Sequence, residues 1–318
     1  MEPAANPFDL LSRSVIVTGT HYSMTTLTGA LLATADEYHL LHEPLNPEPT
    51  LSYDSLRPPR WYEYYGTDRF EELAQALAVF LDRNSFPAQV LDRLSSVRTP
   101  QEVGQVARYC QRKMPFVLSA RPAVLKDPFL AFSARTLQQE LGMKVVLTLR
   151  HPAGFAESMI RKAGQFDFSD LASQHSLLET VPDEADEICR FAASNPPAIE
   201  QAALLWRVIY GFAARYLVPD ARTMTVRQED MVSNTQAAID RLFAFAHAQP
   251  TPSTGRLVAK NLQAQSDDHA GGSYIRRDGA AATNKWRERL GADDIALLQE
   301  QTGELAARLG YNDFDWSH

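Results

Sequence analysis

The sequence has little cysteine, no excess of positive charge and no long apolar stretch. Among 318 residues there are two cysteines, Cys110 and Cys189, which form neither a CxxC pair nor a Cys/His cluster. This excludes a disulfide framework and predicts reduced thiols in a cytoplasmic protein. The net charge of −8 gives no support for a nucleic-acid partner bound by phosphate neutralisation, although it is compatible with a local basic pocket for a small anion.

Targeting and membrane features are also absent from the sequence. Residues 1–14 carry acids and prolines without an apolar core, so no secretory signal is predicted. No apolar run approaches about 18 residues, so no transmembrane segment is predicted. With 45% hydrophobic and 22% charged residues, the composition is that of an ordinary globular protein, and we expect a single domain over 1–318. No spacing of ligands predicts a metal site.

Segments typical of strands alternate with segments typical of helices. Short β-branched runs predict strands, and apolar residues at helical spacing predict helices. Strands are expected over 14–19, 38–41, 122–126, 144–149 and 221–226, and helices over 24–35, 67–82, 100–113, 152–162, 198–216, 234–247 and 292–309. This alternation predicts an α/β fold, a three-layer arrangement in which a parallel central sheet carries helices on both faces. Three stretches, 44–66, 165–197 and 251–284, are predicted to be loop or lid insertions.

The first chemically informative segment follows the first predicted strand and runs from Gly19 to Thr26. A loop between a strand and a helix N-terminus binds anions through free backbone N–H groups and the helix dipole. The hydroxyls of Ser23, Thr25 and Thr26 add donors for phosphate or sulfate oxygens. The alternative is a simple N-cap cluster. The Walker A pattern is absent, and so is its lysine.

Two further segments carry basic residues. Arg150 leaves the strand 144–149, and Ser158 follows eight residues later, so both side chains can reach one anion. An arginine that only caps the sheet edge is the alternative. The second segment contains Arg276, Arg277 and Gly279 and continues with Lys285, Trp286 and Arg287. This composition suits a clamp that closes on a nucleotide phosphate, but it also suits a solvated surface loop.

Taken together and in this order, the three segments resemble the PAPS-dependent sulfotransferase family, with its P-loop-related fold. The resemblance covers most of the chain and includes Glu229-Asp230-Met231, which is similar to the family's Glu-Asp-Leu stretch. His42-Glu43-Pro44 resembles the segment that carries a carboxylate base in many carbohydrate sulfotransferases. The order of the motifs is specific, although no single one is.

The resemblance implies a role for each segment. PAPS would be the sulfuryl donor and PAP the product, with no metal. The loop would hold the 5′-phosphosulfate, Arg150 and Ser158 would hold the 3′-phosphate, and Arg277, Gly279 and Lys285 would close over the donor, with Trp286 against the adenine. The loop residues concerned are Thr20, His21, Tyr22, Ser23, Met24, Thr25 and Thr26.

The sequence departs from the family inside the loop. The family has a lysine or arginine just before the loop serine and a glycine just after it, and here these positions are Tyr22 and Met24. A cation at this point would stabilise charge on the bridging oxygen. His21, Lys126, Arg287 or a cation from another segment are the candidates to replace it. Without a replacement, the protein would be a weak enzyme or a donor-binding homologue.

Glu43 is the first candidate for the base that takes the acceptor's proton, and His42 is the second. A turn-capping role is the alternative for Glu43. Lys126 stands where related enzymes carry a base histidine, and a lysine there favours stabilisation of sulfate charge. His151 is expected to cap its helix rather than to contact substrate.

The resemblance implies an acceptor that is a hydroxyl or amine of a small molecule, a carbohydrate or a lipid, and the sequence does not choose among them. Trp61, Tyr62, Tyr64 and Tyr65 are either stacking residues for the acceptor or core residues beneath the loop. A P-loop-type nucleotide kinase is the rival function, and the absent loop lysine counts against it. Self-association is left open, because the last helix can pack on the core or on another copy.

Overall fold

The molecule is built on one five-stranded sheet in which every neighbouring pair of strands is parallel. The computed structural model describes residues 6–48, 57–162, 164–262 and 283–316. The strands lie in the order β2-β3-β1-β4-β5. Their bounds are β1 (Val15–Gly19), β2 (His39–His42), β3 (Ala123–Lys126), β4 (Lys144–Leu149) and β5 (Thr223–Arg227). The predicted α/β fold with a parallel central sheet is confirmed.

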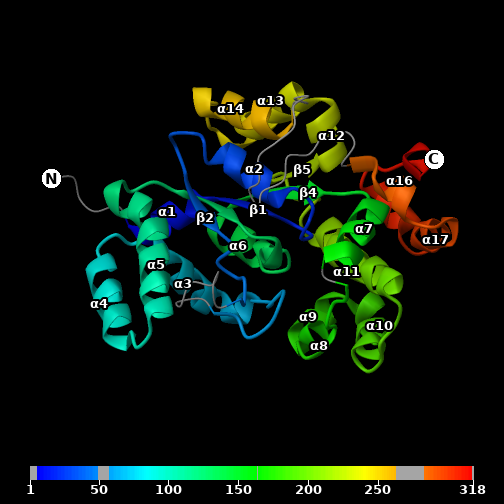
Figure 1. Cartoon of the computed structure of the whole chain (residues 1–318), viewed down its shortest axis with the longest axis horizontal. Helices are drawn as coiled ribbons and strands as arrows, with labels where there is room; N and C mark the ends of the chain where they lie inside the picture. Colours follow the sequence, from blue (N-terminus) through cyan, green and yellow to red (C-terminus); the bar gives the residue numbers. More distant parts are fainter. Residues whose placement is uncertain (1–5, 49–56, 163, 263–282, 317–318) are drawn as a thin grey trace.

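Helices cover both faces of this sheet, as Figure 1 shows. One face carries α2 (Thr25–Leu32), α12 (Gln228–Ser233), α13 (Thr235–Ala246) and α14 (Pro252–Asn261). On the other side lie α1 (Pro7–Ser12), α3 (Phe70–Leu81), α5 (Pro100–Leu118), α6 (Ala134–Leu141), α7 (Pro152–Lys162), α11 (Ala198–Tyr216) and α17 (Ala292–Arg308). Shorter or more peripheral elements are η1 (Thr67–Arg69), α4 (Phe86–Ser96), η2 (Pro128–Leu130), α8 (Ser169–Ala172), α9 (His175–Thr180), α10 (Pro182–Ala192), α16 (Trp286–Arg289) and α18 (Asp313–Trp316).

Two apolar cores result from the alternation of side chains along the strands. In β1, Val15 and Val17 belong to the core under α2 and α13, whereas Ile16 belongs to the core under α7 and α11. All three side chains are buried, which explains why β1 reads as a continuous apolar run rather than as an alternating one. The terminal helix α17 packs on α11 and α7, so its apolar face is covered by the core of the same chain.

The structure differs from the sequence prediction mainly in the insertions. Residues 165–197 contain α8, α9 and α10, whose buried side chains join the core, because their apolar residues recur at helical spacing between the prolines. Residues 252–261 form α14 rather than loop, since Thr251 caps it and Pro252 occupies the first turn. Helices α1, α4, α6 and α12 and the short helices α16 and α18 were not predicted. In the described parts of the chain, no helix is both long and apolar enough to cross a bilayer.

Strand register brings the predicted site segments to one edge of the sheet. Gly19 pairs with Thr148, so the loop after β1 and the residues after β4 begin side by side. Lys126 pairs with both Val17 and His42, which places it at the same carboxyl edge. Ligands of open parallel sheets bind at this edge, at the point where the strand order reverses around β1.

We predict that Gly19→Ala destabilises the fold by about 3 kcal/mol or more. Gly19 has φ of 148°, and a Cβ there would lie 2.3 Å from the carbonyl oxygen of Thr148. Gly255→Ala is the matched control, because Gly255 lies inside α14 with open space around it. The control should stabilise the protein by about 0.5–1 kcal/mol. Urea unfolding measures the free energy of unfolding of both variants. Equal effects of the two substitutions would contradict the close contact at Gly19.

Candidate nucleotide-binding site

The loop after β1 is anchored to β4 and α11 by buried hydroxyls. Thr20 Oγ1 lies 3.0 Å from the hydroxyl of Tyr210, which donates to the carbonyl of Thr148 at 2.9 Å. Ser23 Oγ donates to the carbonyl of Thr20 and lies 2.8 Å from Thr148 Oγ1. The side chains of Thr20 and Ser23 are fully buried. Contrary to the expectation for Ser23, its hydroxyl therefore faces the sheet in this structure, and it shapes the loop.

The backbone of the same loop points toward the edge of the sheet. Tyr22 and Met24 adopt left-handed conformations, with φ of 66° and 67°, which explains why a glycine would suit position 24. Helix α2 then begins at Thr25 with Met24 as its N-cap residue, and the Met24 side chain makes no capping hydrogen bond. Because the first N–H groups of a helix have no intrahelical acceptor, the amides of Thr25 and Thr26 are available to an anion.

Arg150 joins the loop to the start of α7. Its Nη1 donates to the carbonyl of Tyr22 at 2.7 Å and to Ser158 Oγ at 3.0 Å. The indole Nε1–H of Trp206, on α11, donates a hydrogen bond to the carbonyl of Arg150 at 3.0 Å. The predicted pair Arg150 and Ser158 is thus brought together beside the loop.

Two further arginines, Arg161 and Arg289, contact Glu157, which precedes Ser158, and neither was predicted as a site residue. Glu157 accepts from Ser158 Oγ at 3.1 Å, from Arg161 Nε at 2.9 Å, and from Arg289 of α16. Although burial favours its neutral form, Arg289 and Arg161 hold the pKa of Glu157 below its usual range.

His21 lies inside the loop, next to Tyr22. Its Nδ1 is 2.7 Å from the hydroxyl of the fully buried Tyr62. Burial and the charge of Lys162 lower the pKa of His21 to about 4, against a smaller opposite effect of Glu43. The imidazole is therefore neutral near pH 7. Lys162 also stacks its ammonium on the Tyr22 ring, 4.3 Å from the centroid.

The predicted catalytic residues Glu43, His42 and Lys126 form one cluster. Lys126 is almost fully buried and its Nζ forms an ion pair with Glu43 Oε1, while Asn46 donates to Glu43 Oε2 at 2.8 Å. Burial would raise the pKa of Glu43, but Lys126 and Asn46 hold it below its usual value. Burial and Lys126 lower the pKa of His42 to about 4, and its Nε2 lies 3.8 Å from Glu43.

Helix α2 leaves room for this lysine. A Cβ on Gly29 would lie 2.7 Å from Cβ and Cγ of Lys126, so only glycine permits the observed contact between α2 and the lysine stem. The Lys126 ammonium is consequently held at the carboxyl edge of β3, one strand away from the loop after β1.

The C-terminal segment is only partly described. Arg277 and Gly279 lie outside the described residues, and Lys285 stands half-buried at the start of α16. Trp286 is buried, and its indole stacks on His151 at 4.9 Å between ring centroids. The indole therefore exposes no face to an adenine in this conformation. Arg287 packs over the Trp286 ring, and its guanidinium donates to the carbonyl of Asp315.

Four aromatic residues were considered for the acceptor. Tyr62 and Tyr65 are buried in the larger core, and Trp61 and Tyr64 are half-buried against it. This group therefore belongs to the core or packs against it. Among the described residues, no group of three or more His, Cys, Asp or Glu side chains is arranged to hold a metal.

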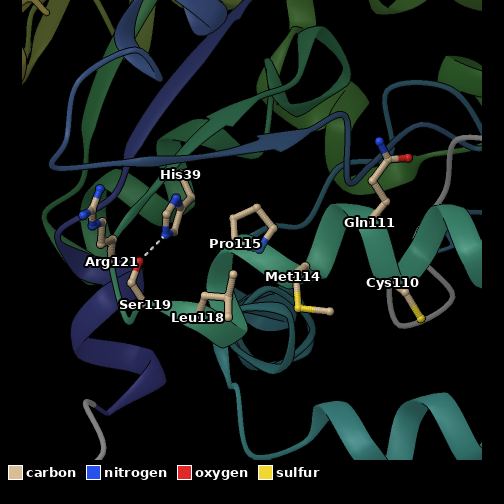
Figure 2. A pocket seen from close by; sticks show the side chains of 8 residues that line it. All are labelled: His39, Cys110, Gln111, Met114, Pro115, Leu118, Ser119 and Arg121. Atoms are coloured by element: carbon tan, nitrogen blue, oxygen red, sulfur yellow. Dashed lines mark hydrogen bonds between the residues drawn. The ribbon is translucent and has the colours of Figure 1, made fainter.

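A separate groove lies away from this site (Figure 2). It runs along the C-terminal half of α5, past Met114 and Leu118, to His39, which bonds Ser119 at 2.8 Å. His39 begins β2 and Arg121 precedes β3, so the groove is at the amino ends of these strands. It is therefore distinct from the residues at the carboxyl edge.

Comparisons with known proteins agree with this architecture. No protein-family model and no curated protein matches the chain. The solved sulfotransferase domain of the Synechococcus PCC 7002 olefin synthase is 16% identical with a TM-score of 0.50, over 94% of each chain. The sulfotransferase domain from the curacin biosynthetic pathway is 15% identical with a TM-score of 0.52, over 94% of this chain and 98% of that one. The chain has the fold of sulfotransferase domains.

The surroundings of His151 predict how stability depends on pH. Its Nδ1 accepts from the Ala153 amide at 3.3 Å, as expected for a helix cap. Burial, followed by Arg287, Arg227 and Arg150, lowers the pKa of His151 from 6.5 to about 3. The unfolded chain binds the proton more readily than the folded protein does. The contribution of neutral His151 to the free energy of unfolding is therefore complete above pH 6.5 and is lost as the pH falls toward 3.

We predict that His151→Asn, which keeps a capping acceptor, makes the protein less sensitive to acid. Between about pH 7.5 and about pH 5, the variant should lose about 2 kcal/mol less unfolding free energy than the wild-type protein. Urea unfolding at the two pH values measures this difference. An equal loss in both proteins would show that His151 is not held neutral.

Proposed function

We propose that this chain is a PAPS-dependent sulfotransferase that moves a sulfuryl group to a hydroxyl or amine and releases PAP. The observation that carries the proposal is the meeting of three groups at one sheet edge. These are the free amides at the start of α2, the Arg150–Ser158 pair, and the Glu43–Lys126 pair. The fold shared with sulfotransferase domains supports the same assignment.

The proposed donor site has two ends. The amides of Thr25 and Thr26 bind the 5′-phosphosulfate, and Arg150 with Ser158 binds the 3′-phosphate, assisted by Arg161 and Arg289. Glu157 now accepts hydrogen bonds from Ser158 and both of these arginines. The nucleotide phosphate therefore competes with this carboxylate for the same donors.

The transfer is a single in-line displacement. The acceptor oxygen or nitrogen forms a bond to sulfur while the bond between sulfur and the bridging oxygen breaks, and that electron pair goes to the 5′-phosphate of PAP. Glu43 takes the acceptor's proton, with His42 as the second candidate, because both lie at the end of β2. Lys126 stabilises the sulfuryl charge from beside Glu43.

The acceptor is proposed to be a small molecule, a glycan or a lipid rather than a nucleic acid, since a net charge of −8 does not favour binding by phosphate neutralisation. Both solved neighbours are named for biosynthetic systems, an olefin synthase and the curacin pathway. The two free cysteines, Cys110 and Cys189, support a cytoplasmic setting. A nucleotide kinase is the rival, and the loop offers no lysine to the phosphates of ATP.

The first test is calorimetric titration with PAP, with Mg-ATP as the competing ligand. The wild-type protein should bind PAP and prefer it to Mg-ATP. Arg150→Ala should lower the affinity for PAP by about 10- to 100-fold, because a charge-assisted contact to phosphate is lost. Arg256→Ala is the matched control, since Arg256 is exposed on α14 and its guanidinium contacts Ser253.

Absence of PAP binding, or a preference for Mg-ATP, would overturn the proposal and favour the kinase. A loss of PAP affinity of the same size in Arg256→Ala would show that net charge, rather than the Arg150 site, governs binding.

A further inference from the structure

The loop lacks a cation at the position before Ser23, where Tyr22 stands. Of the three candidates to replace it, Arg287 donates to the carbonyl of Asp315, and Lys126 pairs with Glu43. His21 is the candidate that belongs to the loop itself. Its ring is half-buried, and its Nε2 has no hydrogen-bond partner among the described residues.

The proton on the His21 ring can be assigned from its contact with Tyr62. The Tyr62 hydroxyl accepts the backbone N–H of His21 at 3.4 Å and lies 2.7 Å from His21 Nδ1. A phenol has one proton, and a fully buried hydroxyl donates it wherever an acceptor is in reach. In the described residues, His21 Nδ1 is that acceptor. The tyrosine therefore donates to Nδ1, and the neutral ring carries its proton on Nε2.

Tyr62 is held rigidly enough to enforce this arrangement. Its ring makes edge contacts with Phe129, Phe132 and Phe166 at 5.1 to 6.0 Å between centroids. Its carbonyl accepts from Gln174, and its φ of 57° is a left-handed conformation that surrounding contacts must maintain. The hydroxyl is therefore presented to His21 by a fixed scaffold.

The His21 ring is within electrostatic reach of both halves of the proposed site. Beside the effect of burial, the charge of Lys162 lowers the pKa of His21 and the charge of Glu43 raises it. Phe155 and Tyr22 contact the ring edge-on, at 5.2 and 4.5 Å between centroids. Nδ1 and Nε2 point in different directions from an imidazole ring, so with Nδ1 engaged by Tyr62 the nitrogen left for a ligand is Nε2.

We propose that His21 replaces the missing loop cation by donating a hydrogen bond from Nε2–H to the 5′-phosphate oxygen that leaves sulfur, and that Tyr62 is the positioning residue that fixes this tautomer. The inference rests on the proposed function, because it names the residue that serves the donor in that reaction. The oxygen gains negative charge as its bond to sulfur breaks, so the hydrogen bond strengthens along the reaction. No proton needs to transfer from His21.

The tautomer is tested by ¹⁵N NMR of the histidine side chains without any ligand. His21 should show a protonated Nε2 and an unprotonated Nδ1, and its signals are assigned from their loss in His21→Gln. Tyr62→Phe should shift the ring toward a mixture of tautomers. A protonated Nδ1 in the wild-type protein, or an unchanged tautomer in Tyr62→Phe, would overturn the role of Tyr62.

The contact is tested with two ligands that differ only at the 5′ end, PAP and adenosine 3′-monophosphate. Glutamine places an N–H close to the position of His Nε2, whereas asparagine reaches only to that of Nδ1. His21→Asn should reduce the preference for PAP over adenosine 3′-monophosphate by about tenfold, and His21→Gln should retain most of it.

The outcomes separate this inference from the proposed function. If the wild-type protein binds neither ligand, the donor site itself is wrong. If it binds both and His21→Asn leaves the preference within about twofold of wild type, the donor site stands and the role of His21 is wrong. Equal losses in the asparagine and glutamine variants would likewise contradict a contact through Nε2.

Discussion

The candidate site depends on the hydrogen bonds that anchor the first loop to the sheet. Thr20 and Ser23 use their buried hydroxyls to hold the loop against Thr148 and Tyr210. With the hydroxyls of Thr20 and Ser23 engaged in this way, the loop is left to contact a ligand through its backbone and through half-buried side chains such as His21. The structure thus separates two tasks. Hydroxyls fix the shape of the loop, and amides remain for an anion.

The departures from the family pattern have distinct physical consequences. Met24 occupies a left-handed conformation that a glycine would adopt without strain, so the loop keeps its path at some cost in stability. Tyr22 removes a cation, but its carbonyl still accepts from Arg150 and its ring lies beneath Lys162. Positive charge is therefore retained around the loop, although the chain as a whole carries −8.

The parallel sheet and the ends of its strands could be predicted from the sequence, because apolar runs such as 144–149 end directly at polar motifs. The contacts of Arg150 with Ser158 and of Lys126 with Glu43 follow from those strand ends. The place of Arg289 in the site and the contact of Tyr62 with His21 could not be predicted, because these residues come from distant segments and only tertiary packing brings them there. The inward turn of Ser23 and the burial of Trp286 were unpredictable for the same reason.

The central claim is that the first loop and Arg150 form the two ends of one nucleotide site, and a crystal structure with bound PAP tests it most directly. We predict that the 5′-phosphate lies on the amides of Thr25 and Thr26 and that the 3′-phosphate lies on Arg150 and Ser158, with Glu157 displaced from Ser158. PAP bound elsewhere, or bound with only one phosphate at this edge of the sheet, would contradict a single site with these two ends.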